Sequence, residues 1–226
     1  MNWFAYIDLY CERTAPGLMN EPANAVSNAA FFLAALLAMR AALKAGDAAR
    51  RDGFLWVLIA LVAVIGAGSA AFHTFAERWS LIADVAPITA FIYAFFFYAM
   101  RRYIGLGTTG ALAAMVGFLA LSFGFGELMP AGALNGSGDY LPAFAAMVAV
   151  GAELIRRGHP AGHWVLGAGG VFAISLTFRT VDPAVCPAFP TGTHFLWHIL
   201  NATVLYLLLM SGVRYGRGVE RGGAGT

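Results

Sequence analysis

The chain has 226 residues, of which 60% are hydrophobic and only 12% are charged, and its mean hydropathy is +0.71. Soluble globular domains carry about a quarter of their residues as charged side chains, so this composition excludes an ordinary soluble domain. The formal net charge of +2 comes from basic residues between apolar runs, where they anchor the loops of membrane proteins. We therefore expect a membrane protein that does not bind nucleic acid.

Seven apolar runs have the length of transmembrane helices, which need about 20 residues and at least about 17. In chain order they are Ala23–Leu43, Phe54–Phe72, Leu81–Met100, Ile104–Phe125, Tyr140–Ile155, His163–Phe178 and Thr193–Val213. The fifth and sixth runs have only 16 residues each, so flanking residues must extend them. The sequence predicts an all-α membrane protein, a single seven-transmembrane helix bundle over residues 1–226, with an N-terminal segment 1–22 and a tail 215–226.

The basic residues predict the orientation of this bundle. Eleven of the 14 follow the first, third, fifth and seventh runs. These are Arg40, Lys44, Arg50, Arg51, Arg101, Arg102, Arg156, Arg157, Arg214, Arg217 and Arg221, whereas Arg13, Arg78 and Arg179 fall on the other side. The positive-inside rule then places the N-terminus outside and the C-terminus in the cytoplasm. We expect a multi-pass protein of a bacterial inner membrane, without a cleavable signal peptide because the first 20 residues are mixed and polar.

Three histidines and one aspartate lie in or against these apolar runs, all at the outer ends. His73 follows the second run, Asp84 opens the third, and His194 and His198 open the seventh. An ionisable side chain at this depth is costly unless it is paired or coordinated. Histidines four residues apart share one helix face, and a third imidazole completes a set that leaves zinc an open catalytic position. We therefore predict a zinc site; the alternative is that each histidine satisfies a helix terminus or a hydroxyl.

Two further side chains could act beside such a metal. Zinc lowers the pKa of its bound water to about 7, and Asp84 could act as general base and acid through that water, or as a fourth ligand. Ser69, one turn before His73, could donate a hydrogen bond to a developing oxyanion. A serine in a membrane helix also often bonds the carbonyl four residues back. His159 and His163 fall on the cytoplasmic side and are interpreted as interfacial residues.

The outer side also carries two cysteines and several acids. Cys11 and Cys186 could form a disulfide in an oxidising compartment, or remain two free thiols. The acids Asp8, Glu12 and Glu21 precede or open the first run. Oxygen ligands of this kind suit calcium, although a solvated acidic stretch at a helix start is the commoner explanation.

Four segments in order carry a resemblance to a known family. They are Cys11-Glu12 with the pattern Glu-x-x-Asn-x-x-Ser-Asn from Glu21 to Asn28, then Gly66–His73, then Asp84, then Gly192–His198. In this combination the chain resembles the alkaline ceramidase family, within a superfamily of seven-helix intramembrane hydrolases that includes the adiponectin-type receptors. The resemblance implies an amidase that cleaves ceramide-like lipids to a fatty acid and a sphingoid base.

The resemblance also implies roles for individual residues. It assigns zinc to His73, His194 and His198, water activation to Asp84 and oxyanion support to Ser69. It further implies a disulfide between Cys11 and Cys186, and a calcium site at the positions of Glu12 and Glu21. The chain departs from the family at Leu9-Tyr10, where the family has Asp-Trp before Cys-Glu.

The sequence thus predicts a zinc-dependent intramembrane amide hydrolase, whose Phe-rich stretch Phe91–Phe97 lines an acyl pocket or faces lipid. The alternatives are a hydrolase of another lipid amide or ester, and a seven-helix receptor or sensor with structural zinc. A retinal-binding pump is excluded, because its Schiff base needs a lysine inside the seventh helix. The one lysine, Lys44, lies at the end of the first run.

Overall fold

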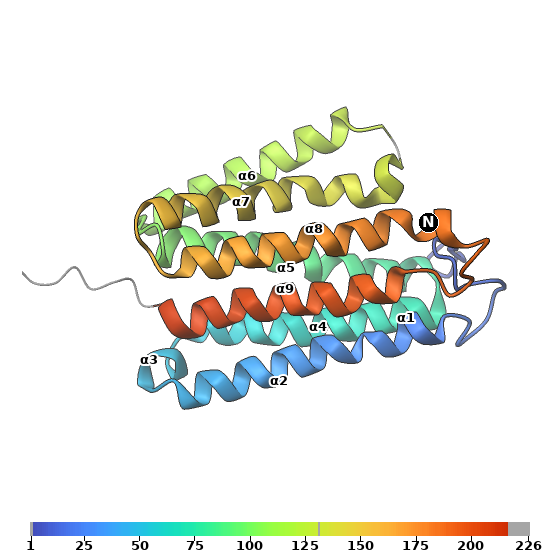
Figure 1. Cartoon of the computed structure of the whole chain (residues 1–226), viewed down its shortest axis with the longest axis horizontal. Coiled ribbons are helices and arrows are strands. Elements are labelled where there is room, and N and C mark those ends of the chain that lie inside the picture. Colours follow the sequence, from blue (N-terminus) through green and yellow to red (C-terminus); the bar gives the residue numbers. More distant parts are fainter. Residues whose placement is uncertain (1, 131, 217–226) are drawn as a thin grey trace, which may run out of the picture.

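A computed structural model describes residues 2–130 and 132–216 as a bundle of long helices (Figure 1). In chain order the elements are α1 (Pro22–Ser27), α2 (Ala29–Lys44), α3 (Asp47–Arg50), α4 (Gly53–Phe75), α5 (Arg78–Arg102), α6 (Thr108–Leu128), η1 (Ala133–Tyr140), α7 (Leu141–Arg156), α8 (Ala161–Val185) and α9 (His194–Tyr215). Seven helical segments in these ranges are long and apolar enough to cross a membrane. The predicted all-α seven-transmembrane helix bundle is confirmed.

The number and order of the predicted runs are right, and the boundaries differ where local backbone geometry decides them. The fifth and sixth spans extend to Ala133–Arg156 and Ala161–Val185, with 24 and 25 residues, as the thickness of a bilayer requires. The predicted start of the fourth run at Ile104 is wrong. Gly105 has a φ of +82°, which turns the chain out of α5 before α6 begins.

Two other boundary predictions are wrong in ways that matter for the candidate site. The third span begins at Arg78, so Asp84 lies in the second turn of α5 and does not open it. The sixth span continues past Phe178 to Val185, so Arg179 and Asp182 are helical. An apolar run in the sequence ends at the first charged side chain. A helix can continue beyond that residue when its polar side chains form hydrogen bonds within the protein.

Helix α9 lies at the centre of the bundle and contacts α2, α4 and α8. Its buried apolar residues, with those of α2, α4 and α5, form one continuous core. Helix α6 is peripheral: Ala111 is its buried residue, and its far end diverges from the other helices (Figure 1). The N-terminal segment and the end of α9 lie at opposite ends of the bundle, as an odd number of spans requires.

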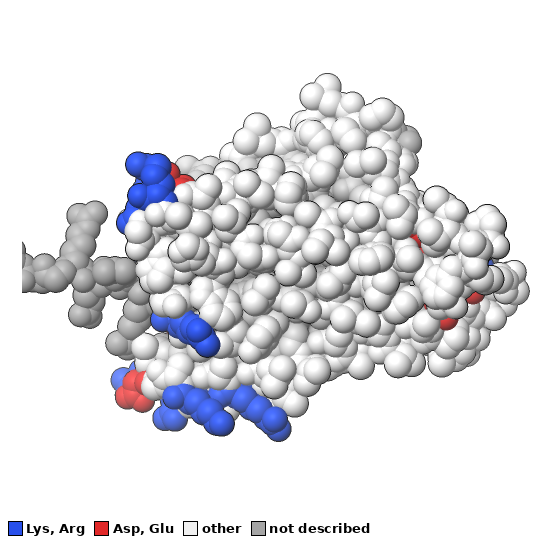
Figure 2. All heavy atoms as spheres, in the orientation of Figure 1, with Lys and Arg blue, Asp and Glu red and all other residues white. Residues whose placement is uncertain are grey.

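The charged side chains gather at the two ends of the bundle. In Figure 2, Lys and Arg cluster at the end where α9 finishes, and the central band of the face drawn is white. The basic residues of this cluster come from the ends of α2, α5, α7 and α9. Arg217 and Arg221, in the predicted tail 215–226, lie outside the described residues. The distribution fits a bundle whose two ends face different aqueous compartments.

The predicted orientation can be tested with reporters at the two termini. A reporter after Thr226 is expected to be cytoplasmic and one ahead of Met1 external, because basic loops are retained in the cytoplasm. Activity of a compartment-specific reporter pair in whole cells measures this. The reverse pattern would place the N-terminal end of the bundle in the cytoplasm.

Candidate metal centre

Three histidines from two helices meet at the N-terminal end of the bundle. His73 lies in the last turn of α4, His194 is the first residue of α9, and His198 follows one turn later. All three are buried, and one ligand atom of each lies within 4.8 Å of the others. The Nε2 atoms of His73 and His198 are 3.1 Å apart. The cluster is close enough to bind a metal ion.

Helix α1 orients two of these imidazoles. Ser27 donates a hydrogen bond to the carbonyl oxygen of Asn24 at 2.8 Å, so its Oγ is free to accept from Nδ1 of His198, also at 2.8 Å. Nδ1 of His73 donates to the Glu21 carboxylate at 2.5 Å. Both Nε2 atoms are then left unprotonated and face each other. Metal-ligating histidines generally donate their second ring N–H to such an oxygen.

Glu21 is a buried part of this centre and not a solvated acid. Its Oε1 accepts from Nε of Arg13 at 2.5 Å, and its Oε2 also accepts from the Asn24 amide at 3.0 Å. Arg13 donates in addition to the carbonyl oxygen of His73 at 3.0 Å. Burial raises the pKa of the Glu21 carboxyl, but the hydrogen bonds from His73 and Arg13 outweigh this effect and hold its pKa below the usual value. The carboxylate therefore stays ionised beside the histidine.

Glu12 serves the start of α1. Its two carboxylate oxygens accept from the backbone N–H groups of Ala23 and Asn24 at 2.7 and 2.8 Å, which are donors that a helix start leaves unsatisfied. Both acids of the predicted calcium site, Glu12 and Glu21, thus already have protein partners. Calcium binding stays a prediction to which this geometry adds no support.

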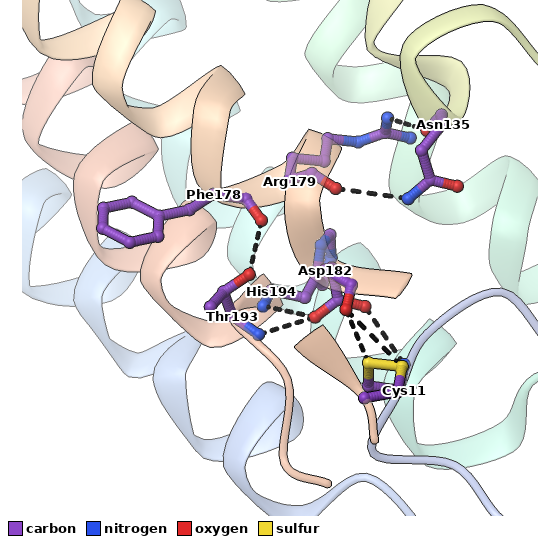
Figure 3. The surroundings of a disulfide bond; sticks show 8 residues. Cys11, Asn135, Phe178, Arg179, Asp182, Thr193 and His194 are labelled. Atoms are coloured by element: carbon purple, nitrogen blue, oxygen red, sulfur yellow. Dashed lines mark hydrogen bonds between the residues drawn. A yellow bond between two sulfur atoms is a disulfide. The ribbon is translucent and has the colours of Figure 1, made fainter. Parts of the chain in front are cut away.

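Asp182 fixes the start of α9, as Figure 3 shows. Its Oδ1 accepts from the backbone N–H groups of Thr193 and His194 at 2.6 and 2.9 Å, and its Oδ2 accepts from that of Cys11 at 3.1 Å. A carboxylate at this position satisfies orphan donors and complements the helix dipole. Asp182 was missed by sequence reasoning because the predicted sixth run ended at Phe178, four residues before it.

A disulfide joins Cys11 to Cys186, with a Cα–Cα distance of 5.4 Å. The bond holds the N-terminal segment across the histidines, where the ring of Tyr10 stacks on His194 with centroids 3.6 Å apart. The Tyr10 ring also lies 5.2 Å from that of His73. Burial raises the pKa of the Tyr10 hydroxyl, so the side chain that covers His194 is uncharged. Sequence reasoning noted Tyr10 only as a departure from a family pattern.

Reduction of this disulfide is expected to lower the thermal stability of the protein. The two cysteines are 175 residues apart in sequence, and closing a loop of this length contributes about 4–5 kcal/mol in the chain-entropy model, less where a membrane already restricts the unfolded chain. Thermal unfolding with and without reductant measures the effect, with Cys11→Ser/Cys186→Ser as the control that reductant should not affect. Free reaction of both thiols with a label in the unreduced, denatured protein would contradict the bond.

Close contact between α4 and α5 brings Ser69 and Asp84 to the same level. A Cβ at Gly68 would lie 2.0 Å from the carbonyl oxygen of Ala83, so only glycine allows this approach. Pro87 lies four residues after Ala83 within α5 and has no N–H to give that carbonyl. The carbonyl oxygen of Ala83 therefore lacks its usual helical donor where α4 packs against α5.

Asp84 is a buried carboxylate of α5 at the same end of the bundle as the histidines. It is 8% exposed, and its Oδ1 is buried without a hydrogen-bond partner among the described residues. Ser69, also buried, lies on α4, which packs against α5. The alternative bond of Ser69 to the carbonyl four residues back does not form, although Thr74 on the same helix makes such a bond to Ala70.

Arg179 places a fixed positive charge beside the centre. Its guanidinium lies over the rings of Tyr140 and Trp197, at 5.4 and 5.8 Å from their centroids. It donates to the carbonyl oxygen of Asn135 at 2.7 Å and to Ser137 at 3.1 Å. Sequence reasoning placed Arg179 in an outer loop. The missed signal is that this arginine directly follows an apolar run, which indicates that its guanidinium has partners within the protein.

A cavity with an almost wholly apolar lining, partly open at the surface, lies deeper in the bundle than the histidines. Three of its lining residues lie one helical turn from residues of the candidate site. Ile65 precedes Ser69 on α4, Ile88 follows Asp84 on α5, and Asn201 follows His198 on α9. Phe91, Phe95 and Phe96 also line it, which is one of the two uses that the sequence left open for the Phe-rich stretch. The cavity thus begins one turn deeper in the bundle than the histidines.

A metal ion fits the residues present. Three imidazoles offer nitrogen donors, two have their second nitrogen fixed by oxygens, and the buried Nδ1 of His194 has no hydrogen-bond partner in the described part of the chain. Of the two other histidines, His159 packs against Tyr103 and Tyr215.

No protein-family model and no curated protein matches the chain.

Proposed function

We propose that this chain is a zinc-dependent intramembrane amide hydrolase that cleaves ceramide-like lipids to a fatty acid and a sphingoid base. The observation that carries the proposal is the buried cluster of His73, His194 and His198 beside Asp84 and directly above an apolar cavity. Three imidazoles suit zinc and leave one coordination position open. The resemblance of the motifs to alkaline ceramidases supports the same reaction class.

Zinc in such a site supplies a Lewis acid and lowers the pKa of a water at its open position. Asp84 accepts a proton from the attacking water, since its Oδ1 has no competing hydrogen bond. It then returns this proton to the amine nitrogen as the amide C–N bond breaks. Ser69 donates a hydrogen bond to the carbonyl oxygen, on which negative charge develops. Water is consumed, and a carboxylic acid and an amine are formed.

The surrounding residues hold this arrangement in place. Glu21 and Ser27 fix the rings of His73 and His198 through Nδ1, so that little reorganisation is needed when the metal binds. Tyr10 covers His194 and limits access of bulk water from the aqueous side. A long acyl or base chain lies in the apolar cavity, while its amide reaches the cluster one turn above.

A receptor or sensor with structural zinc is the less favoured function. Structural zinc sites are closed by four protein ligands, whereas the cluster in the described residues has three. The nearby Asp84 carboxylate keeps an unpaired oxygen, which a proton-transfer role uses and a closed site does not.

The distribution of basic residues supports a location for this activity. With the Lys- and Arg-rich end in the cytoplasm, the centre lies near the outer surface, which is the periplasmic side of a bacterial inner membrane. Substrate then enters from the outer leaflet.

Analysis of lipid products tests the proposed function. Purified protein is incubated with ceramides of several acyl lengths and with matched lipid esters, with and without a chelator. We expect release of fatty acid and sphingoid base that stops on chelation and returns with added zinc. Cleavage of esters alone would favour the alternative hydrolase, and absence of any metal-dependent product would contradict hydrolysis.

A further inference from the structure

Asn201 is a polar residue in the wall of an otherwise apolar cavity. Of the residues that line the cavity, only Tyr140 and Asn201 carry a polar side-chain group. Asn201 is only 4% exposed, yet its carboxamide makes no hydrogen bond to another residue in the described ranges. Two other polar side chains of α9 do have hydrogen-bond partners: Thr203 donates to the carbonyl oxygen of Ile199, and Ser211 donates to that of Leu208.

A carboxamide enclosed by an apolar wall is costly without a partner, and polar groups inside proteins are therefore hydrogen-bonded as a rule. Asn201 borders the cavity, so a partner can come from the molecule that fills it. An aliphatic residue at this position would have matched the surrounding wall of Phe172, Val204 and Leu205. The residue is thus better explained by recognition of a ligand than by packing.

The position of Asn201 relative to the metal centre limits which part of the ligand it meets. It follows His198 by three residues on α9, which is about 4.5 Å along the axis of a helix. Side chains of a helix lean towards its N-terminus, so the carboxamide leans towards the level of His198. It reaches groups close to the scissile amide and not the far end of an acyl chain.

We propose that Asn201 is a specificity-determining residue that binds a hydroxyl group two or three bonds from the scissile amide. A carboxamide has both donors and an acceptor and so matches a hydroxyl, which donates and accepts. An ionised group is excluded, because the rest of the wall is apolar and gives it no counter-charge. The proposal rests on the proposed function and deepens it by naming a feature of the substrate.

Three hydroxyls have this spacing in lipids of the proposed class. One is on the carbon next to the carbonyl, in a 2-hydroxyacyl chain. The other two are on the first and third carbons of the base, on either side of the carbon that carries the nitrogen. Matched amide lipids with and without each hydroxyl distinguish the three sources.

The test compares wild type with Asn201→Leu and Asn201→Ala in detergent micelles. Binding of each lipid is measured by native mass spectrometry, and hydrolysis by product analysis. We expect wild type to prefer one hydroxylated lipid over its matched analogue by about 10- to 100-fold, the effect of one hydrogen bond in a buried site. In both variants this ratio should fall to near one. Thr203→Val is the matched control, because Thr203 is an exposed polar residue of the same helix, and should keep the preference.

The outcomes separate the two proposals. A preference in binding that is lost in both variants supports the role of Asn201 even if wild type cleaves none of the lipids, in which case the hydrolase function is wrong. Cleavage by wild type without a hydroxyl preference in any of the three pairs overturns the role of Asn201 and leaves the hydrolase function standing. Retention of the preference in Asn201→Ala also overturns it. The metal content of each variant shows whether the centre is intact. The alanine variant, with its smaller side chain, provides the test if the leucine variant does not fold.

Discussion

Replacing any one of His73, His194 and His198 by alanine is expected to remove most of the bound metal and, with it, hydrolysis of lipid amides. Wild-type protein should carry about one zinc per chain, because three imidazoles from two helices form the site before the metal binds. Loss of one ligand leaves two nitrogens in a buried pocket. Elemental analysis of the purified variants and product analysis with the same ceramides measure the two effects.

His163→Ala is the matched control for this series, because His163 is exposed at the opposite end of the bundle and should leave metal content unchanged. Glu21→Gln should have an intermediate effect, with metal affinity lower by about 10- to 100-fold, the usual cost of losing an outer partner of a ligating histidine. Full metal retention in all three alanine variants would refute the assignment of the centre.

Asp84→Asn is expected to lower the rate of amide hydrolysis by about 10²–10⁴-fold, the range of general acid–base catalysis, while fold and metal content are kept. Asparagine preserves the size of the side chain and one oxygen, but it cannot accept a proton at neutral pH. The expectation follows from the unpaired Oδ1 beside the cluster. The measurement is kcat for ceramide cleavage together with elemental analysis.

Ser69→Ala provides the comparison for Asp84→Asn, with an expected loss of about 10²–10³-fold, as for one oxyanion donor. If Asp84→Asn loses the metal, the aspartate is a ligand and not the base. If the variant retains both metal and full activity, the proposed mechanism is wrong.

The sequence by itself determined the class of the fold and the identity of the clustered residues. Seven apolar runs and the position of basic residues depend only on local composition, and burial in a bilayer imposes a fixed length on each span. The spacing of His194 and His198 follows from helix periodicity. Ionisable residues in an apolar run need a partner wherever they lie, which identified His73 and Asp84 as candidates without a structure.

Only the tertiary structure decided which partners these residues have. Glu21, predicted as a solvated acid or a calcium ligand, is buried between Arg13 and His73, and Asp182 caps α9 from another helix. Such contacts join residues far apart in the chain, and no local pattern encodes them. Arg179 and Asp182, which continue the sixth apolar run, were predicted to lie in a loop. Hydropathy does not include the hydrogen bonds that make the burial of such polar residues possible. The place of Asn201 in the cavity wall likewise depends on the packing of whole helices, and the place of Tyr10 depends on the disulfide between Cys11 and Cys186.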